Sequence, residues 1–270
     1  MCYDVETQLR RKIKEALHQG AAIEEIEYLR IKLDQFIQAY GEEELASHEH
    51  HWTMGFQHQK IPVITNEQPE TLQFYQWGLI PSWAKDAQAA SEISNKCLNA
   101  RGDTIFEKPA FRTAAKDRRC IIPVSGYYEH HWVDSKGKTK VPYFVKRKND
   151  APLYLAGLWE SWFDKETGEE VRTCSIITTS ANARLAKVHN RKPDDPRMLV
   201  VLPIDRVHEW LAPINGTADI DLLKSLCVPF EDELLDIYPV RQLRGNAGIG
   251  DSPLSSVRFE YPIIGLPENN

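Results

Sequence analysis

The sequence has 270 residues, of which 42% are hydrophobic and 27% are charged, and its formal net charge is −6 at pH 7. This composition is typical of a soluble globular protein and excludes extensive disorder. No stretch approaches the length of about eighteen uninterrupted apolar residues that a membrane-spanning helix needs, and the first residues lack the layout of a secretory signal. We therefore expect a cytoplasmic protein that does not bind a membrane.

The positive charge is concentrated in one part of the chain. Residues 96–148 contain thirteen Lys or Arg and five Asp or Glu, a local charge of +8, whereas the remaining residues together carry −14. A basic segment within an acidic protein indicates a local surface for a polyanion such as nucleic acid.

Neither the cysteines nor the histidines indicate a metal site. The five cysteines are widely spaced and form no CxxC pair, which favours reduced thiols over a disulfide framework or a zinc site. His48, His50 and His51 lie in a polar stretch, 42–51, that is predicted to be a connection. Such a loop lacks further ligands at coordination spacing, so we expect no metal there.

The predicted secondary structure changes character near Gly55. Apolar residues at helical spacing predict helices over 9–17 and 23–40, which form a helical hairpin within residues 6–40. Further helices are predicted over 180–188, 204–211 and 220–226, and an extended segment after Asp232. Short β-type runs separated by Pro and Gly are predicted at 61–65, 72–77, 119–123, 126–132, 142–146, 153–162, 173–179 and 198–202.

These elements predict one α+β domain over residues 1–270. Its core is a curved, mainly antiparallel, barrel-like sheet, with peripheral helices and the N-terminal helical hairpin around it. The runs are too short, and too often joined by tight connections, for a doubly wound parallel sheet.

Cys2 is the first candidate for chemistry, because it follows the initiator Met directly. Removal of Met1 would leave an α-amine and a thiol on one residue. The amine is partly neutral at about pH 7.5, and the thiol titrates not far above that pH. Such a 1,2-aminothiol condenses with an aldehyde to an imine and then closes to a thiazolidine ring. The alternative is that Cys2 is an incidental small apolar residue.

Two segments in the middle of the chain could meet a nucleic acid. Trp77 and Trp83 flank a Pro turn and serve either as core residues or as a surface on which bases stack. Asn99 and Arg101 are two residues apart on a segment expected to be extended, so both side chains can face one phosphate or sugar.

Glu129 and His189 are the candidates for proton transfer. Glu129 lies in an aromatic run that ends at Trp132, and a buried carboxylate there suits a general acid or base; alternatively it lies on the solvent side of the strand. His189 follows a predicted helix, where it either bonds the last carbonyls or acts as a proton-transfer group or phosphate donor.

Six segments, taken in order, resemble the SRAP family, the SOS response-associated peptidases that are also described as abasic-site processing proteins. The resemblance covers Cys2 and about residues 61–202. It is carried by Met1-Cys2, WGLIPSW (77–83), Asn-Ala-Arg (99–101), RRCIIPVSGYYE (118–129), AGLWE (156–160) and TTSAN…H (178–189).

The resemblance implies a DNA-damage response protein that binds single-stranded DNA and crosslinks covalently to abasic sites through Cys2. Asn99 would orient Cys2 and the opened sugar, and Glu129 would shuttle protons. His189 would assist sugar opening or meet the adjacent phosphate, while Arg101 would hold the backbone. The resemblance further implies autoproteolytic removal of Met1 and lyase cleavage of the strand. No metal, organic cofactor or obligate protein partner is expected.

The sequence departs from the family pattern at several positions. Tyr3 and Asp4 replace the usual Gly-Arg after Cys2, and Asp103 replaces a Glu. After His189, either Arg191 keeps the role of the family arginine or an insertion has moved that role to Arg197. His130 stands where the family often has Trp, and Trp132 follows two residues later.

Two alternatives of other classes remain. The first is a thiol peptidase that uses Cys2, His189 and Glu129 on peptide bonds. The second is a non-catalytic single-strand binding module, in which the basic segment binds the backbone and Trp77, Trp83 and Trp132 stack on bases.

Overall fold

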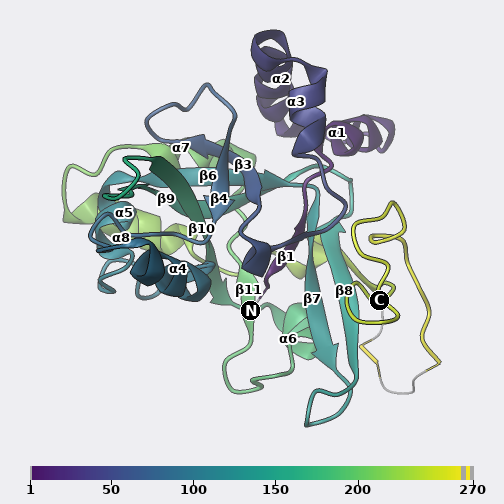
Figure 1. Ribbon diagram of the computed structural model, residues 1–270. Coiled ribbons are helices and arrows are strands. Elements are labelled where there is room, and N and C mark those ends of the chain that lie inside the picture. Colours follow the sequence, from purple (N-terminus) through teal and green to yellow (C-terminus); the bar gives the residue numbers. More distant parts are fainter. Residues whose placement is uncertain (1, 263–265, 268–270) are drawn as a thin grey trace.

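In the computed structural model, which describes residues 2–262 and 266–267, five strands pair in a ring and form a small barrel (Figure 1). The ring closes because β10 pairs with both β4, in parallel, and β9, in antiparallel orientation. Two short strands, β5 (Asn99–Arg101) and β11 (Arg197–Leu199), also pair with β10. The ring strands are β3 (Lys60–Thr65), β4 (Gln73–Trp77), β6 (Arg119–Val124), β9 (Leu153–Phe163) and β10 (Glu170–Ser180).

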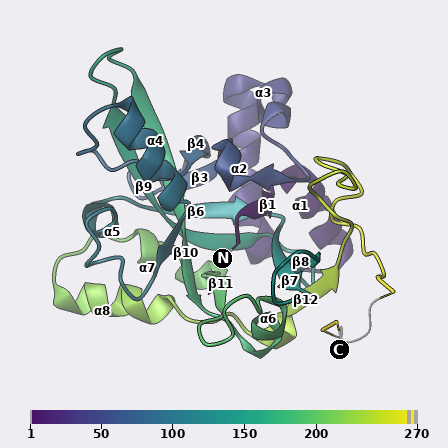
Figure 2. The ribbon, with the colours of Figure 1, turned by 60° about the horizontal axis from the view of Figure 1, so that its bottom comes forward.

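A second, antiparallel sheet lies beside the barrel and holds the N-terminal strand β1 (Asp4–Glu6) in its interior. β1 lies between β7 and β2, with Val5 opposite Tyr127 on one side and Thr53 on the other. Figures 1 and 2 both show the start of the chain between the barrel and this sheet. The remaining strands are β2 (Thr53–Met54), β7 (Gly126–Trp132), β8 (Lys140–Arg147) and β12 (Leu235–Pro239).

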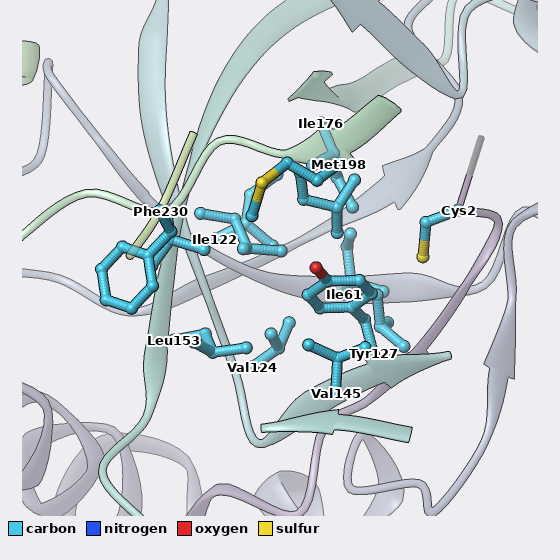
Figure 3. Close-up of a cluster of buried hydrophobic side chains, with 14 of the residues drawn as sticks. Cys2, Ile61, Ile122, Val124, Tyr127, Val145, Leu153, Ile176, Met198 and Phe230 are labelled. Atoms are coloured by element: carbon cyan, nitrogen blue, oxygen red, sulfur yellow. The ribbon is translucent and has the colours of Figure 1, made fainter. Parts of the chain in front are cut away.

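The β6 strand shows how the barrel is built into the core. Its six residues are all buried, as expected for a strand covered on both faces. Alternate residues point to opposite faces. Ile122 and Val124 therefore join the cluster shared with β1, β7 and β8, while Ile121 joins the cluster beneath the helices. Figure 3 shows the first of these clusters, with Cys2 at its edge.

The helices cover the outside of the barrel and sheet. Leu9 and Ile13 of the first helix and Leu29 and Leu33 of the second are buried, which confirms the predicted hairpin. Among the described residues, no helix has the length and apolarity to cross a bilayer. The helices are α1 (Leu9–His18), α2 (Ile23–Tyr40), α3 (Glu42–Ser47), α4 (Ala87–Lys96), α5 (Arg112–Asp117), α6 (Ala183–Val188), α7 (Val207–Leu211) and α8 (Thr217–Leu226), with 3₁₀ turns at Gly55–Gln57, Ile204–Arg206 and Asp232–Leu234.

The predicted α+β class with a barrel-like core is confirmed, and each predicted strand is present. The stretch 42–51, predicted to be a connection, contains the helix α3. Gly41 adopts a φ of 93° and ends α2. Three glutamates then occupy the first turn of α3, where their negative charges interact favourably with the positive end of the helix dipole. Sequence patterns also missed β1, α4 and α5, and the extended tail after Asp232 contains β12.

Candidate site at the N-terminal strand

Cys2 lies two residues before the strand β1 begins, so the pairing of β1 positions it. Because β1 pairs with β7, Cys2 is only 2% exposed, and its Sγ lies 3.2 Å from the backbone oxygens of Asp4 and Tyr128. A protonated thiol is a donor, so these carbonyls stabilise the neutral form of the side chain. The Cys2 side chain is therefore a buried, protonated thiol.

The largest electrostatic influences on Cys2 also favour the neutral thiol. Burial raises the pKa of the Cys2 thiol well above its usual value, and the negative charge of Glu129 raises it further. The same two influences raise the pKa of Tyr127, whose hydroxyl is buried and has no hydrogen-bond partner within the described residues. Glu129 therefore lies close enough to Cys2 to act on it.

We expect the folded protein to resist alkylation at neutral pH. The thiolate is the reactive form, and burial raises the pKa of Cys97 to about 11 and of Cys227 to about 12, as well as that of Cys2. Intact mass after iodoacetamide treatment at about pH 7.5 should show little labelling of the native protein and five additions after unfolding in guanidinium. Rapid native labelling that peptide mapping assigns to Cys2 would contradict the buried, protonated thiol.

Asn99 connects the barrel to Cys2. It is the first residue of β5, which lies parallel to β10, and its Nδ2 donates a hydrogen bond of 2.7 Å to the Cys2 backbone oxygen. Ala100 is buried beneath the helices, so Asn99 and Arg101 project from the opposite face of the strand, as predicted. Asn99 Oδ1 is buried without a partner among the described residues, so it can accept a hydrogen bond from a bound ligand.

A pocket of about 430 Å³ opens beside the start of β1, where Tyr3 and Asp4 line it; Cys2 and Asn99 are not among its lining residues. Glu129 lines it and is 4% exposed, and its Oε1 accepts a hydrogen bond of 3.0 Å from the His130 N–H. The full lining is Tyr3, Asp4, Phe56, Glu129, His130, Trp132, Lys140, His189, Arg191, Gln242 and Arg244. In the part of the chain that the structure describes, no group of three or more His, Cys, Asp or Glu could hold a metal ion.

His189 lies at the pocket directly after α6, a short capped helix that ends at Val188. Asn182 caps α6 by accepting the Leu185 N–H at 2.9 Å, and the His189 N–H donates to the Leu185 oxygen at 2.7 Å. The His189 Nδ1 lies 2.9 Å from both the backbone nitrogen and the backbone oxygen of Arg197. The bond to the Leu185 carbonyl is made by the backbone of His189, whereas its ring contacts the backbone of Arg197 on β11 at the edge of the pocket.

Trp132 and Arg191 form one rim of the pocket. The Arg191 guanidinium lies 5.1 Å and the Lys140 Nζ 4.7 Å from the Trp132 ring, within the range of cation–π contacts. The backbone N–H of Trp132 donates to Asn190 Oδ1 at 2.8 Å, which ties the end of β7 to the residue after His189.

Of the two arginines that could fill the family role, the geometry favours Arg191. Arg191 is exposed and lines the pocket. Arg197 is 5% exposed, and its Nη2 donates to the backbone oxygen of Thr178 at 2.9 Å. Its guanidinium therefore stabilises β10 and is not available to a DNA backbone.

Arg101 is exposed but already paired with carboxylates. Its Nη1 donates to Asp195 Oδ2 at 2.6 Å and its Nη2 to Asp103 Oδ2 at 2.8 Å. These contacts raise the pKa of Arg101 and lower those of both carboxyls. A DNA phosphate at Arg101 would therefore compete with Asp195 and Asp103.

The predicted stacking role of Trp77 is wrong, because this side chain is wholly buried and its Nε1 donates to the Leu98 oxygen at 2.8 Å. Trp83 is 55% exposed but does not line the pocket. The cations of the basic segment, residues 96–148, do not form one surface at the pocket. Arg119 is buried and donates to the backbone oxygens of Trp210 and Ala212. Among the Lys and Arg residues of this segment, only Lys140 lines the pocket. The predicted removal of Met1 lies outside the described residues.

Several lining residues had no signal in the sequence. Tyr3 and Asp4 were noted only as departures from a pattern, and Gln242 and Arg244 come from the tail after Asp232. Lys140 belonged to the basic segment, but nothing distinguished it from the other lysines there.

The fold and the site together define a barrel protein in which a buried cysteine directly precedes the residues of a Glu- and His-lined pocket at the N-terminal strand. A family model described as SOS response associated peptidase (SRAP) matches residues 21–247, and the chain belongs to this family. The predicted resemblance is thus confirmed.

Individual relatives agree with this assignment. The abasic site processing protein YoaM of Bacillus subtilis is 39% identical over 68% of this chain and 74% of its own length. The abasic site processing protein HMCES of chicken is 31% identical over 43% of this chain and 39% of its own length. A crystal structure of a protein from Bacteroides thetaiotaomicron superimposes with a TM-score of 0.69 at 36% identity and covers 78% of this chain and 86% of its own.

Proposed function

We propose that this protein processes abasic sites in single-stranded DNA and does so by forming a covalent crosslink through Cys2 once Met1 is removed. The neutral α-amine adds to the carbon of the ring-opened sugar aldehyde, and loss of one water gives an imine. The thiol then adds across the C=N bond, so that sulfur bonds to carbon and the thiol proton moves to nitrogen. The product is a thiazolidine that shields the lesion.

The observation that carries the proposal is the 2.7 Å hydrogen bond from Asn99 to the Cys2 backbone. It fixes residue 2 beside a pocket that holds a carboxylate and an imidazole, which are the groups that imine formation needs for proton transfer. The names of the relatives, which call them abasic site processing proteins, point to the same substrate.

The roles proposed for the remaining residues are supported by the positions of their side chains. Glu129 accepts a proton from the adding amine and returns one to the departing water. His189, anchored by Arg197, lines the same pocket and assists opening of the sugar. Arg191 and Arg101 bind phosphates, and the face of Trp132 meets a base.

The protonated state of the Cys2 thiol favours this chemistry over that of a thiol peptidase. A cysteine peptidase attacks with a thiolate, which a neighbouring histidine generates. Here the hydrogen bonds of Cys2 Sγ within the described residues go to backbone oxygens, and burial and Glu129 raise the pKa of the thiol. An imine-first reaction needs the neutral amine first and tolerates a protonated thiol.

The test is denaturing-gel electrophoresis of the protein after incubation with an oligonucleotide that contains one abasic site, beside an intact strand. We expect a heat-resistant shifted band with the abasic strand alone, from protein whose intact mass lacks Met1. Equal, salt-reversible binding of both strands without a covalent band would instead identify a binding module. Repeated turnover of a peptide pool would identify a peptidase.

Removing the charge of Asp195 should strengthen DNA binding. Because Asp195 neutralises Arg101, an Asp195→Asn variant should bind single-stranded DNA about two- to fivefold more tightly at low salt, in line with the small energies of exposed ion pairs. Fluorescence anisotropy measures the affinity. Asp194→Asn is the matched control, since it removes the same charge from the same loop, and an equal gain in that variant would show a general charge effect.

A further inference from the structure

Arg244 is a cation of the pocket that comes from the C-terminal segment. It follows β12 and lines the pocket together with Tyr3 and Glu129, and its side chain is 41% exposed. Figure 1 shows this segment, in yellow, running beside the sheet that contains β1. A residue more than two hundred positions away from Cys2 in the sequence therefore reaches the nucleophile's own strand.

Asp4 holds Arg244 in place. The Asp4 carboxylate is 1% exposed, and both of its oxygens accept hydrogen bonds from Arg244 Nη2. The Trp52 Nε1 donates to Asp4 Oδ1 at 2.9 Å, and the Arg244 guanidinium also lies 5.7 Å from the Trp52 ring. A buried carboxylate is costly unless its charge is paired and its oxygens accept hydrogen bonds. The contacts from Arg244 and Trp52 meet this need, so Asp4 and Arg244 stay paired.

The loop that carries Arg244 is closed on itself. The Ile249 N–H donates to the Gln242 oxygen at 2.9 Å, and the Gly250 N–H donates to the Leu243 oxygen at 3.2 Å. A Cβ at Gly248 would approach the Arg244 backbone to 2.6 Å, so the turn is tight enough to require glycine there. The backbone of Arg244 is thus fixed as well as its guanidinium.

The geometry leaves part of the guanidinium for a ligand. Within the described residues, the hydrogen bonds of Arg244 all use Nη2, so Nε and Nη1 retain their donors. A planar guanidinium with two such donors matches a phosphate. Lys140 and Arg191 are further cations of the same pocket, so an anionic strand is the ligand that its charge favours.

We propose that Arg244, held by Asp4, binds a backbone phosphate of the DNA strand whose abasic sugar reaches Cys2. This inference rests on the proposed function and adds a strand-binding residue from the C-terminal segment. The cation that the family pattern places next to the nucleophile is replaced here by an Asp, and that Asp holds an arginine from the other end of the chain.

The experiment measures non-covalent binding to a strand that contains a tetrahydrofuran abasic analogue. This analogue has no aldehyde, so the result does not depend on whether the wild-type protein crosslinks to a natural abasic site. Fluorescence anisotropy over a salt series gives the affinity and the slope of log K against log salt. On a single strand, the magnitude of this slope falls by about 0.7 for each phosphate that the protein no longer binds.

Arg244→Gln should weaken binding about three- to tenfold at low salt and reduce the slope by about 0.7. Arg244→Lys should keep the slope and recover part of the affinity. Arg241→Gln is the matched control, because Arg241 lies on the same segment but packs on Phe259 at 4.5 Å and does not line the pocket. A wild-type slope in Arg244→Gln, or an equal loss in Arg241→Gln, would overturn the proposal.

A double variant separates binding from folding, since Arg244→Gln leaves Asp4 buried without its partner. Asp4→Asn with Arg244→Gln removes both charges and should show the same loss of slope with a thermal midpoint nearer to that of the wild type. Asp4→Asn alone keeps the cation but releases it, so we expect a wild-type slope and weaker binding. A double variant that recovers the wild-type slope would show that Arg244 acts only on stability.

Discussion

Cys2→Ala is expected to abolish the heat-resistant adduct with an abasic strand. The variant keeps an α-amine after Met1 removal, so it can form the imine, but it has no thiol to close the ring. The imine hydrolyses when the protein is denatured, and the adduct should therefore appear on the gel only when borohydride is added to reduce it. The expected loss without reductant is complete, because no other group supplies the sulfur.

The matched control is Cys227→Ala, which removes a half-buried thiol from a residue that does not line the pocket. This variant should give the wild-type yield of adduct. A stable adduct from Cys2→Ala without reductant would show that another nucleophile captures the aldehyde. Equal loss in both variants would point to unfolding, which circular dichroism would detect.

Glu129→Gln is expected to slow adduct formation by about a hundredfold or more, the usual range for the loss of a positioned acid or base. The amide keeps an oxygen that can accept the His130 N–H, so the local structure should persist. It cannot take up the proton that the adding amine releases. Rapid-quench sampling on denaturing gels measures the rate, and anisotropy with the tetrahydrofuran analogue should show that the affinity is retained.

Glu160→Gln is a stringent control for this variant. Glu160 is also a carboxylate at the end of a hydrophobic run, it is 3% exposed, and it pairs with Arg118 on the barrel, outside the pocket. Its burial raises its pKa, so loss of its charge tests the effect of a buried carboxylate in general. A Glu129→Gln rate that matches the Glu160→Gln rate would remove Glu129 from the mechanism.

The sequence predicted the barrel well because its strands are buried on both faces and are rich in apolar residues, as in β6. It failed for β1, because Asp4 and Glu6 make this strand look polar although both are 1% exposed. Their charges are compensated by Arg244 and Arg11, and such partners are visible only once the chain is folded.

The candidate site shows the same division. Cys2, Asn99, Glu129 and His189 were identified from motifs along the chain, and the structure brings them to one end of β1. Trp77 carried an equally strong motif and lies in the core. Arg244 had no motif, because its position depends on pairing between the two ends of the chain, which no local pattern encodes.

The interior position of β1 also affects the timing of synthesis. β1 is made well before its partner β7, which begins at Gly126, and before Arg244 and Ser256, which bind Asp4 and Glu6. At about 5–20 residues per second, the first residues wait on the order of ten seconds for β7 alone. During this interval the N-terminus is open to ribosome-bound aminopeptidases, and afterwards Cys2 is enclosed. Methionine removal by an aminopeptidase is therefore expected during translation, and a chain that escapes it would depend on the autoproteolytic removal that the resemblance implies to obtain a free Cys2 amine.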